Sequence, residues 1–157
     1  MDLSLQGVKM LYDNSAPDNS LYSHFFWLNK DLPMGIGAEL SLLYNNNSKF
    51  SPQLDLSSIG FSYSDFVFEV DTRKYRTFNF FIGSSYQVVK HFELSYTIGT
   101  SFINSYIYFG MKPELRFSIG NKERVKIKLS WTHILTKYGG KVEPFGYLSL
   151  GVGYRLF

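Results

Sequence analysis

Apolar and polar residues alternate with a period of two along most of the chain, and this pattern predicts β-strands. The clearest run extends from Ile107 to Ile119, where one face is wholly apolar and the other carries charge. The turn signal Gly120-Asn121-Lys122 follows it, and a second alternating run begins at Val125. Because apolar residues at helical spacing are nowhere sustained, we predict an all-β chain in which these two runs form a hairpin.

The same alternation divides the chain into nine candidate strands, whereas closed barrels of single bacterial chains have even numbers. The apolar parity changes between Ile59 and Phe66, and a tight turn at Ser64-Asp65 would give ten strands. Eight strands follow if residues 1–20 hold no membrane strand, and the chain length favours eight. We therefore predict one domain over residues 1–157, a closed antiparallel up-and-down β-barrel. The nine segments lie near residues 3–12, 21–29, 34–44, 54–70, 75–87, 91–102, 105–119, 123–136 and 144–157.

Composition indicates which face of the strands points outward. Charged residues make up 18% of the chain, against about 25% in soluble domains. The polar face is mostly Gly, Ser, Thr and Asn, which suits a narrow lumen, whereas a soluble barrel would carry dense Lys and Glu outside. We therefore predict a transmembrane barrel with its apolar face on lipid, and a soluble lipid-binding barrel is the alternative. The expected lipid-facing residues are Ile107, Phe109, Met111, Leu115, Phe117, Val125, Ile127, Leu129, Leu148, Leu150, Val152 and Tyr154.

Turn lengths and aromatic residues indicate the orientation of such a barrel. Turns near Asp31, Lys90 and Asn121 have the brevity of the periplasmic side, and four polar stretches are expected to be outer loops. These stretches are residues 13–20, 45–53, 71–76 and 137–143. Aromatic side chains near strand ends fit the girdles found at membrane interfaces. The expected girdle residues are Trp27, Tyr44, Tyr86, Trp131 and Tyr138.

Charged residues of both signs fall on the parity expected to face the lumen. In a narrow interior they should pair, because an unpaired buried charge costs several kcal/mol. We interpret them as a structural plug of ion pairs, and an ion path or gated pore is the alternative. The expected lumen residues are Glu39, Glu93, Lys112, Glu114, Arg116, Lys126, Lys128 and Arg155.

Other features narrow the possible functions. The chain has no cysteine, and His24 and His91 have no acidic or histidine partner at metal-ligand spacing, so we expect no metal and no cofactor. The net charge of +3 is scattered, which predicts no nucleic-acid binding. The first ten residues, MDLSLQGVKM, lack the basic and apolar regions of a secretory signal. For an exported protein we therefore expect a mature chain to which Met1 has been added.

The final residues, GVGYRLF, resemble the closing strand of small bacterial outer-membrane barrels of the opacity-protein and OmpA-transmembrane type. This resemblance implies an outer-membrane location, with the lipid bilayer and lipopolysaccharide around the barrel. It also implies recognition by the barrel-assembly machinery through a terminal aromatic signal, here Tyr154 and Phe157. Other outer-membrane proteins are further partners that it allows.

The segment from Trp131 to Thr136 is similar to the region where lipid A 3-O-deacylases carry a His-x-Ser-Asn motif. This resemblance would place His133 in a hydrolase site, but Leu135 stands at the serine position and Thr136 at the asparagine position. Nucleophilic catalysis needs a hydroxyl beside the imidazole, so we expect no enzyme and no catalytic residue. The predicted function is a non-enzymatic envelope protein with a structural, adhesive or accessory-subunit role. A lipid A-modifying hydrolase and a small-solute channel are the alternatives.

Overall fold

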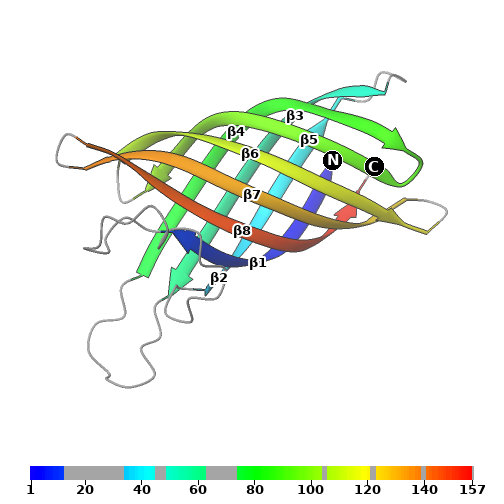
Figure 1. Ribbon diagram of the computed structural model, residues 1–157. Helices are drawn as coiled ribbons and strands as arrows, with labels where there is room; N and C mark the ends of the chain where they lie inside the picture. Colours follow the sequence, from blue (N-terminus) through cyan, green and yellow to red (C-terminus); the bar gives the residue numbers. More distant parts are fainter. Residues whose placement is uncertain are drawn as a thin grey trace.

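The computed structural model describes residues 1–12, 34–44, 49–62, 74–103, 106–120, 123–138 and 141–156. Within these residues the chain forms eight antiparallel strands that close into one barrel (Figure 1). The strands are β1 (Asp2–Tyr12), β2 (Met34–Leu43), β3 (Phe50–Ser62), β4 (Lys74–Val89), β5 (Phe92–Ile103), β6 (Tyr106–Ile119), β7 (Val125–Tyr138) and β8 (Lys141–Arg155). The predicted closed antiparallel barrel of eight strands is confirmed.

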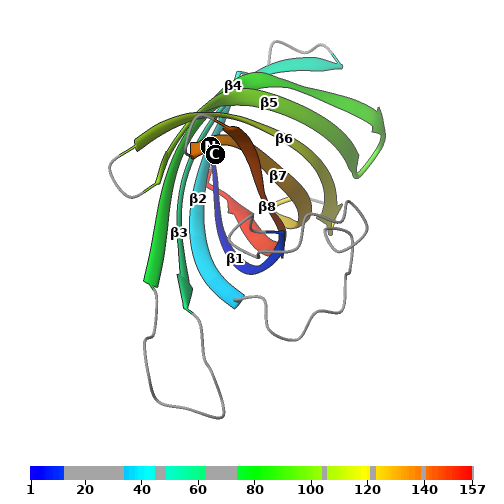
Figure 2. The same ribbon diagram turned by 60° about the vertical axis from the view of Figure 1, so that its left-hand side comes forward.

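Closure is made by β1, which pairs with β2 on one side and with β8 on the other. Asp2 lies opposite Arg155, and the β1–β8 ladder runs from there to Met10 opposite Tyr147. The two ends of the chain meet where this ladder begins, and the Leu156 amide donates a hydrogen bond of 2.9 Å to the Met1 carbonyl (Figure 2). Each of the eight described strands therefore has two neighbours, and the sheet they form has no open edge.

The connections fall at two ends of the barrel. The end that carries both termini, which we call the terminal end, also carries the β2–β3, β4–β5 and β6–β7 connections. The opposite end, the distal end, carries the other four. Two predictions about turns are therefore wrong, because β1 and β2 are connected at the distal end and β2 and β3 at the terminal end, the reverse of what was expected for Asp31 and for residues 45–53. Asp31 and residues 45–48 themselves lie outside the described residues. The short β4–β5 and β6–β7 connections, predicted at Lys90 and Asn121, are both at the terminal end. Asn121 itself lies outside the described residues.

The route to eight strands also differs from the prediction. The candidate strand near residues 3–12 is present as β1 (residues 2–12) and completes the barrel, so the suggested route to eight strands, in which residues 1–20 hold no membrane strand, is wrong. Residues 21–29 and 63–70, which the alternation also assigned to strands, lie outside the described residues. No helix long and apolar enough to cross a membrane occurs in the part of the chain that the structure describes.

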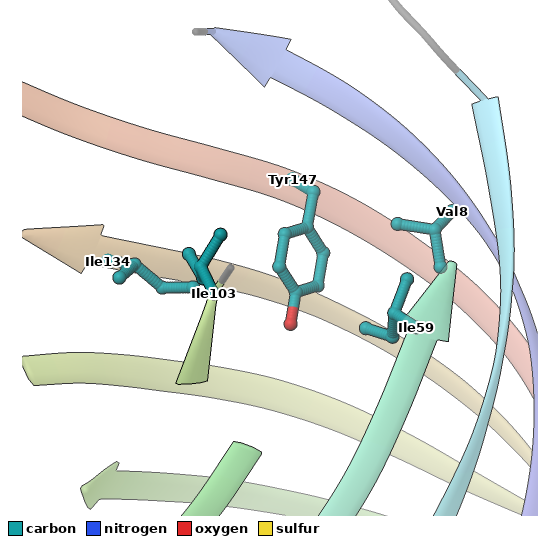
Figure 3. Close-up of a cluster of buried hydrophobic side chains, with 5 residues drawn as sticks. All are labelled: Val8, Ile59, Ile103, Ile134 and Tyr147. Atoms are coloured by element: carbon teal, nitrogen blue, oxygen red, sulfur yellow. The ribbon is translucent and has the colours of Figure 1, made fainter. Parts of the chain in front are cut away.

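Polar side chains line the interior and large apolar side chains cover the outside. Arg116 and Lys126 are fully buried, whereas Leu5 is 72% exposed and Ile36 is 79% exposed. The alternation assigned Ile59 to the apolar, outward face of its segment, and this assignment is wrong. Ile59 is buried in the lumen, on the same face of β3 as Gln53, Asp55 and Ser57. Its inward position is explained by a small apolar cluster in the lumen, toward the distal end. Figure 3 shows this cluster, which consists of Val8, Ile59, Ile103, Ile134 and Tyr147.

The β4 and β5 backbones approach closely at Gly99. A Cβ atom added to Gly99 would lie 2.1 Å from the Phe80 carbonyl oxygen, whereas a Cβ added to Gly60 on β3 would meet nothing within 4 Å. We expect Gly99→Ala to lower the free energy of unfolding by about 1–3 kcal/mol, because the β4–β5 ladder must shift. Gly60→Ala is the matched control and should stay within about 0.5 kcal/mol of the wild type. Urea unfolding of the refolded barrel in detergent micelles measures both, and equal stabilities would contradict the close approach.

Candidate functional site

The terminal half of the lumen holds a network of ionised side chains, which we call the lumen charge network. Among the described residues it contains five acids and five bases, so its formal charges cancel. The members are Asp2, Glu39, Asp55, Glu93, Glu114, Lys112, Arg116, Lys126, Lys128 and Arg155.

The inner part of the network is built around the Lys112 ammonium. Lys112 Nζ lies 2.6 Å from Glu39 Oε2, 2.7 Å from Asp55 Oδ2 and 3.4 Å from Glu114 Oε2. Glu39 also accepts a hydrogen bond from Lys128 Nζ at 3.0 Å. The side chain of Lys112 thus occupies the centre of three carboxylates, the position that a bound cation would otherwise need. No group of three or more His, Cys, Asp or Glu side chains suited to a metal ion occurs among the residues described.

The outer part of the network lies at the terminal mouth of the barrel. Lys126 Nζ lies 3.1 Å from Asp2 Oδ2 and 3.0 Å from Glu93 Oε1. Arg155 Nε is 3.3 Å from Asp2 Oδ1, so an ion pair joins the two strands that close the barrel. Arg116 links the outer and inner parts, because it pairs with Glu114 and its Nη1 lies 3.9 Å from Glu93 Oε2.

Strand alternation explains how residues so far apart in the sequence meet. Each member projects inward from its strand, and β4 contributes the hydroxyl of Ser85, which donates to Glu93 Oε2 at 3.5 Å. In an interior of low dielectric constant, charges attract one another more strongly than in water, but each also loses its hydration. The balance of five acids and five bases offsets that loss only while all the partners stay in place.

The sequence indicated eight of the ten network residues, and the structure brings all eight into this network. It missed Asp2 and Asp55. The Asp55 carboxylate accepts two hydrogen bonds of 2.7 Å from Gln53 Nε2, and Asp55 was overlooked because the apolar parity of β3 was placed on the side of Ile59. Asp2 shares its parity with Ser4 and Gln6, and this polar run at the start of β1 was the available signal.

Asn79 connects the charged half of the lumen to its apolar half. Its Nδ2 donates to Ser57 Oγ at 2.9 Å and to the Tyr147 hydroxyl at 3.0 Å. Tyr147 in turn packs in the apolar cluster, where it lies beside Val8 and Ile59 (Figure 3). Phe81, whose side chain is 1% exposed, occupies the interior as well. Buried side chains of the described strands therefore occur at both levels of the lumen.

Known proteins resemble this chain in fold. No protein-family model matches the sequence, and no curated protein sequence matches it. Among solved structures, the crystal structure of Ail, the attachment invasion locus protein of Yersinia pestis, is 14% identical, with a TM-score of 0.61 over 98% of this chain and 95% of that chain. The backbone structure of Ail in a phospholipid bilayer nanodisc is 15% identical, with a TM-score of 0.57 over 99% of this chain and 100% of that chain.

Neisserial surface protein A gives a second independent match. It is 9% identical, with a TM-score of 0.54 over 99% of this chain and 96% of that chain. The chain has the fold of small outer-membrane β-barrels. The narrower resemblances to the opacity-protein type and to lipid A deacylases remain predictions.

All twelve residues expected to face lipid lie on the outer face of this barrel. Ten are exposed, from Val125 at 37% to Ile107 at 64%, and Met111 and Leu148 are partly exposed. Among the expected girdle residues, Tyr44 and Trp131 are exposed and Tyr86 is partly exposed beside Phe50, with a ring-centroid distance of 4.8 Å. Trp27 lies outside the described residues, and at Tyr138 the backbone alone is described. Tyr154 is on the outer face, and Phe157 lies outside the described residues.

His133 lies on the outer parity of β7, opposite Met111 on β6 and Gly146 on β8. It is partly buried, and its ring centroid is 5.8 Å from that of Trp131. The side chains of Thr136 and Glu143 lie outside the part of the structure that is described. The arrangement around His133 thus adds no observation in favour of a hydrolase.

Glu39 provides a direct test of the lumen charge network. In Glu39→Gln, Lys112 and Lys128 lose a shared carboxylate, and we expect the free energy of unfolding to fall by about 3–5 kcal/mol. The control is Glu123→Gln, which removes a partly exposed pair with His91 (Nδ1–Oε1 3.4 Å) and should cost less than about 1 kcal/mol. Urea titration in micelles measures both variants.

A double variant separates lost charge balance from lost packing. Glu39→Gln with Lys128→Met restores neutrality and should recover part of the stability, which a double-mutant cycle measures as a coupling energy. If Glu39→Gln and the Glu123→Gln control cost the same, the network does not stabilise the barrel.

Proposed function

We propose that the protein is an integral barrel of the bacterial outer membrane that acts as a closed, non-enzymatic surface scaffold. The observation that carries this proposal is the distribution of polar and apolar side chains. Fully buried Arg116 and Lys126 face the lumen, whereas Leu5 and Ile36 are among the many large apolar side chains exposed around the outer wall. Contiguous apolar surface of this extent is unfavourable in water. A bilayer removes that cost, and a closed barrel satisfies the backbone hydrogen bonds that lipid cannot.

The proposed orientation places the terminal end in the periplasm and the distal end outside the cell. Short connections, such as those at Lys90 and Asn121, are typical of the periplasmic side of these barrels, which have longer loops outside. The β1–β2 connection, between Tyr12 and Met34, and the β3–β4 connection, between Ser62 and Lys74, are the longest and belong to the distal end. In this proposal the barrel-assembly machinery recognises the outward-facing Tyr154 of β8 together with Phe157.

The role we propose for the scaffold is adhesion or support of an envelope assembly through the distal connections. The fold shared with Ail, an attachment invasion locus protein, supports an adhesive role. The buried side chains support a scaffold over a channel, because the lumen charge network lies in the terminal half of the lumen and the apolar cluster lies toward the distal end. An eight-stranded barrel has an interior only wide enough for its own side chains.

Membrane insertion can be tested by placing arginine on the outer wall. Leu129→Arg and Phe109→Arg should each lower the stability of the refolded barrel in lipid vesicles by about 2–4 kcal/mol, because both positions would meet the bilayer midplane. Ile119→Arg, beside the β6–β7 connection, should cost about 0–1 kcal/mol as an interfacial control. Denaturant titration in vesicles provides the measurement. Neutral results at both Leu129 and Phe109 would contradict the membrane assignment.

A closed lumen, as proposed, predicts the absence of a pore. Planar bilayers that contain the wild-type protein should show no steady, ion-selective conductance, with insertion verified separately by gel shift on heating. Glu114→Gln should destabilise the barrel by a few kcal/mol, because Arg116 and Lys112 each lose a buried partner. If the wild type conducts steadily, and Glu114→Gln changes its ion preference without loss of stability, the protein is a channel.

A further inference from the structure

The outer wall has a groove of about 920 Å³ over β1, β2, β3 and β8, with an edge at β7. Its floor is formed by residues with little or no side chain, namely Gly7, Ala38, Ser58 and Gly60. The strand register brings these residues together. Ser58 of β3 pairs with Ala38 of β2, and Ile36 of β2 pairs with Gly60 of β3 on one side and with Gly7 of β1 on the other. A Cβ added to Gly60 would meet nothing within 4 Å, so this part of the groove is open space.

The walls of the groove are aliphatic side chains that stand out from the barrel. Leu5, Ile36, Leu150 and Val152 are between 60% and 79% exposed, and the apolar lining continues to Ile127. A site of this size falls within the range of roughly 300–1,000 Å³ that small ligands occupy. Its lining therefore suits flexible hydrocarbon chains.

Two cations flank the groove on its distal side. Arg76 on β4 is exposed and lies directly opposite Gly60. Lys9 on β1 shares the outward parity of Gly7 and lies two residues nearer the distal end. Three strand spacings separate β1 from β4, roughly 14 Å in the hydrogen-bonding direction. A ligand that contacts both cations needs two separate anionic groups, and it also needs an apolar part that lies in the groove.

We propose that this groove binds acyl chains of a bisphosphorylated outer-leaflet lipid of the lipid A type, with one phosphate at Lys9 and the other at Arg76. The inference rests on the proposed membrane location and orientation, which put the distal end in the outer leaflet. Lysine and arginine both form strong charge-assisted hydrogen bonds with phosphate. A glycerophospholipid with a single phosphate, such as phosphatidylglycerol, meets only one of the two cations.

The shape of the groove argues against a second copy of the chain as its occupant. A symmetric dimer brings the same patch of both molecules together, and two concave patches placed face to face leave the groove unfilled. Hydrocarbon chains fill such a depression without requiring a matching surface. The lipid also accounts for the two cations, which would face each other as like charges in a dimer.

The test is native mass spectrometry of the refolded protein released from detergent micelles. The probes are bisphosphorylated lipid A, monophosphorylated lipid A and phosphatidylglycerol, each added at the same concentration. We expect the wild type to retain one bisphosphorylated lipid A, and to retain the other two probes less, by about tenfold or more, because one charge-assisted contact is lost. Gly60→Leu fills the groove and should reduce retention of all three. Ser84→Leu, on the outer wall of β4 away from the groove, is the control and should match the wild type.

The cations are tested separately. Lys9→Gln and Arg76→Gln should each remove the preference for two phosphates over one, whereas Lys90→Gln at the terminal end should preserve it. Equal retention by Gly60→Leu and the wild type would overturn the proposal, as would equal retention of the three probes or a preference for phosphatidylglycerol. A dimer in the wild type that disappears in Gly60→Leu would assign the groove to a second copy. Failure to form a heat-resistant, β-rich barrel in micelles would instead contradict the proposed membrane function, because no lipid comparison is then possible.

Discussion

The pairing of β1 with β8 is the constraint on which the rest of the structure depends. Until these strands pair, the sheet has two edges with unpaired backbone groups, and its inward face has no opposite wall. Closure satisfies the backbone and at the same time brings Asp2 of β1 within 3.3 Å of Arg155 of β8. The polar face then becomes a lumen and the apolar face becomes a continuous outer wall. The proposed membrane location depends on this separation.

The contents of the lumen differ along its length. Toward the terminal end, acids and bases cancel one another, with Lys112 held among three carboxylates. Toward the distal end, Val8, Ile59 and Tyr147 belong to an apolar cluster. Asn79 bonds to the Tyr147 hydroxyl between these two regions. If the barrel is closed to solutes, as proposed, differences in function between such proteins are expected in the wall and the connections.

Much of the fold could be predicted from alternation alone, because side-chain direction in a strand has a fixed period. That period placed Glu114, Arg116 and Lys128 inside the barrel correctly. It failed at β3, because the inward-facing Ile59 made the polar face resemble the apolar one. Asp55, which lies on the same face, was therefore not identified as a lumen residue.

The turns expected near Asp31 and at residues 45–53 were also assigned to the wrong ends of the barrel. Counting residues 21–29 as a barrel strand reverses the predicted direction of the strand that follows, and turn length alone does not reveal the reversal. The groove beside Gly60 was not predictable, since small outward residues matter only when neighbouring strands place them side by side.

The lumen charge network also determines when the barrel can form. Lys112 and Glu39 are 73 residues apart in the sequence, Lys128 and Glu39 are 89 apart, and Arg155 and Asp2 are 153 apart. Contacts of such separation are slow to form, and the last of them requires the first and final strands to be present together. A partly assembled sheet would hold ionised groups without partners in a medium of low dielectric constant. Intermediates on the folding path are therefore penalised, and the complete barrel is expected to form in a single cooperative step.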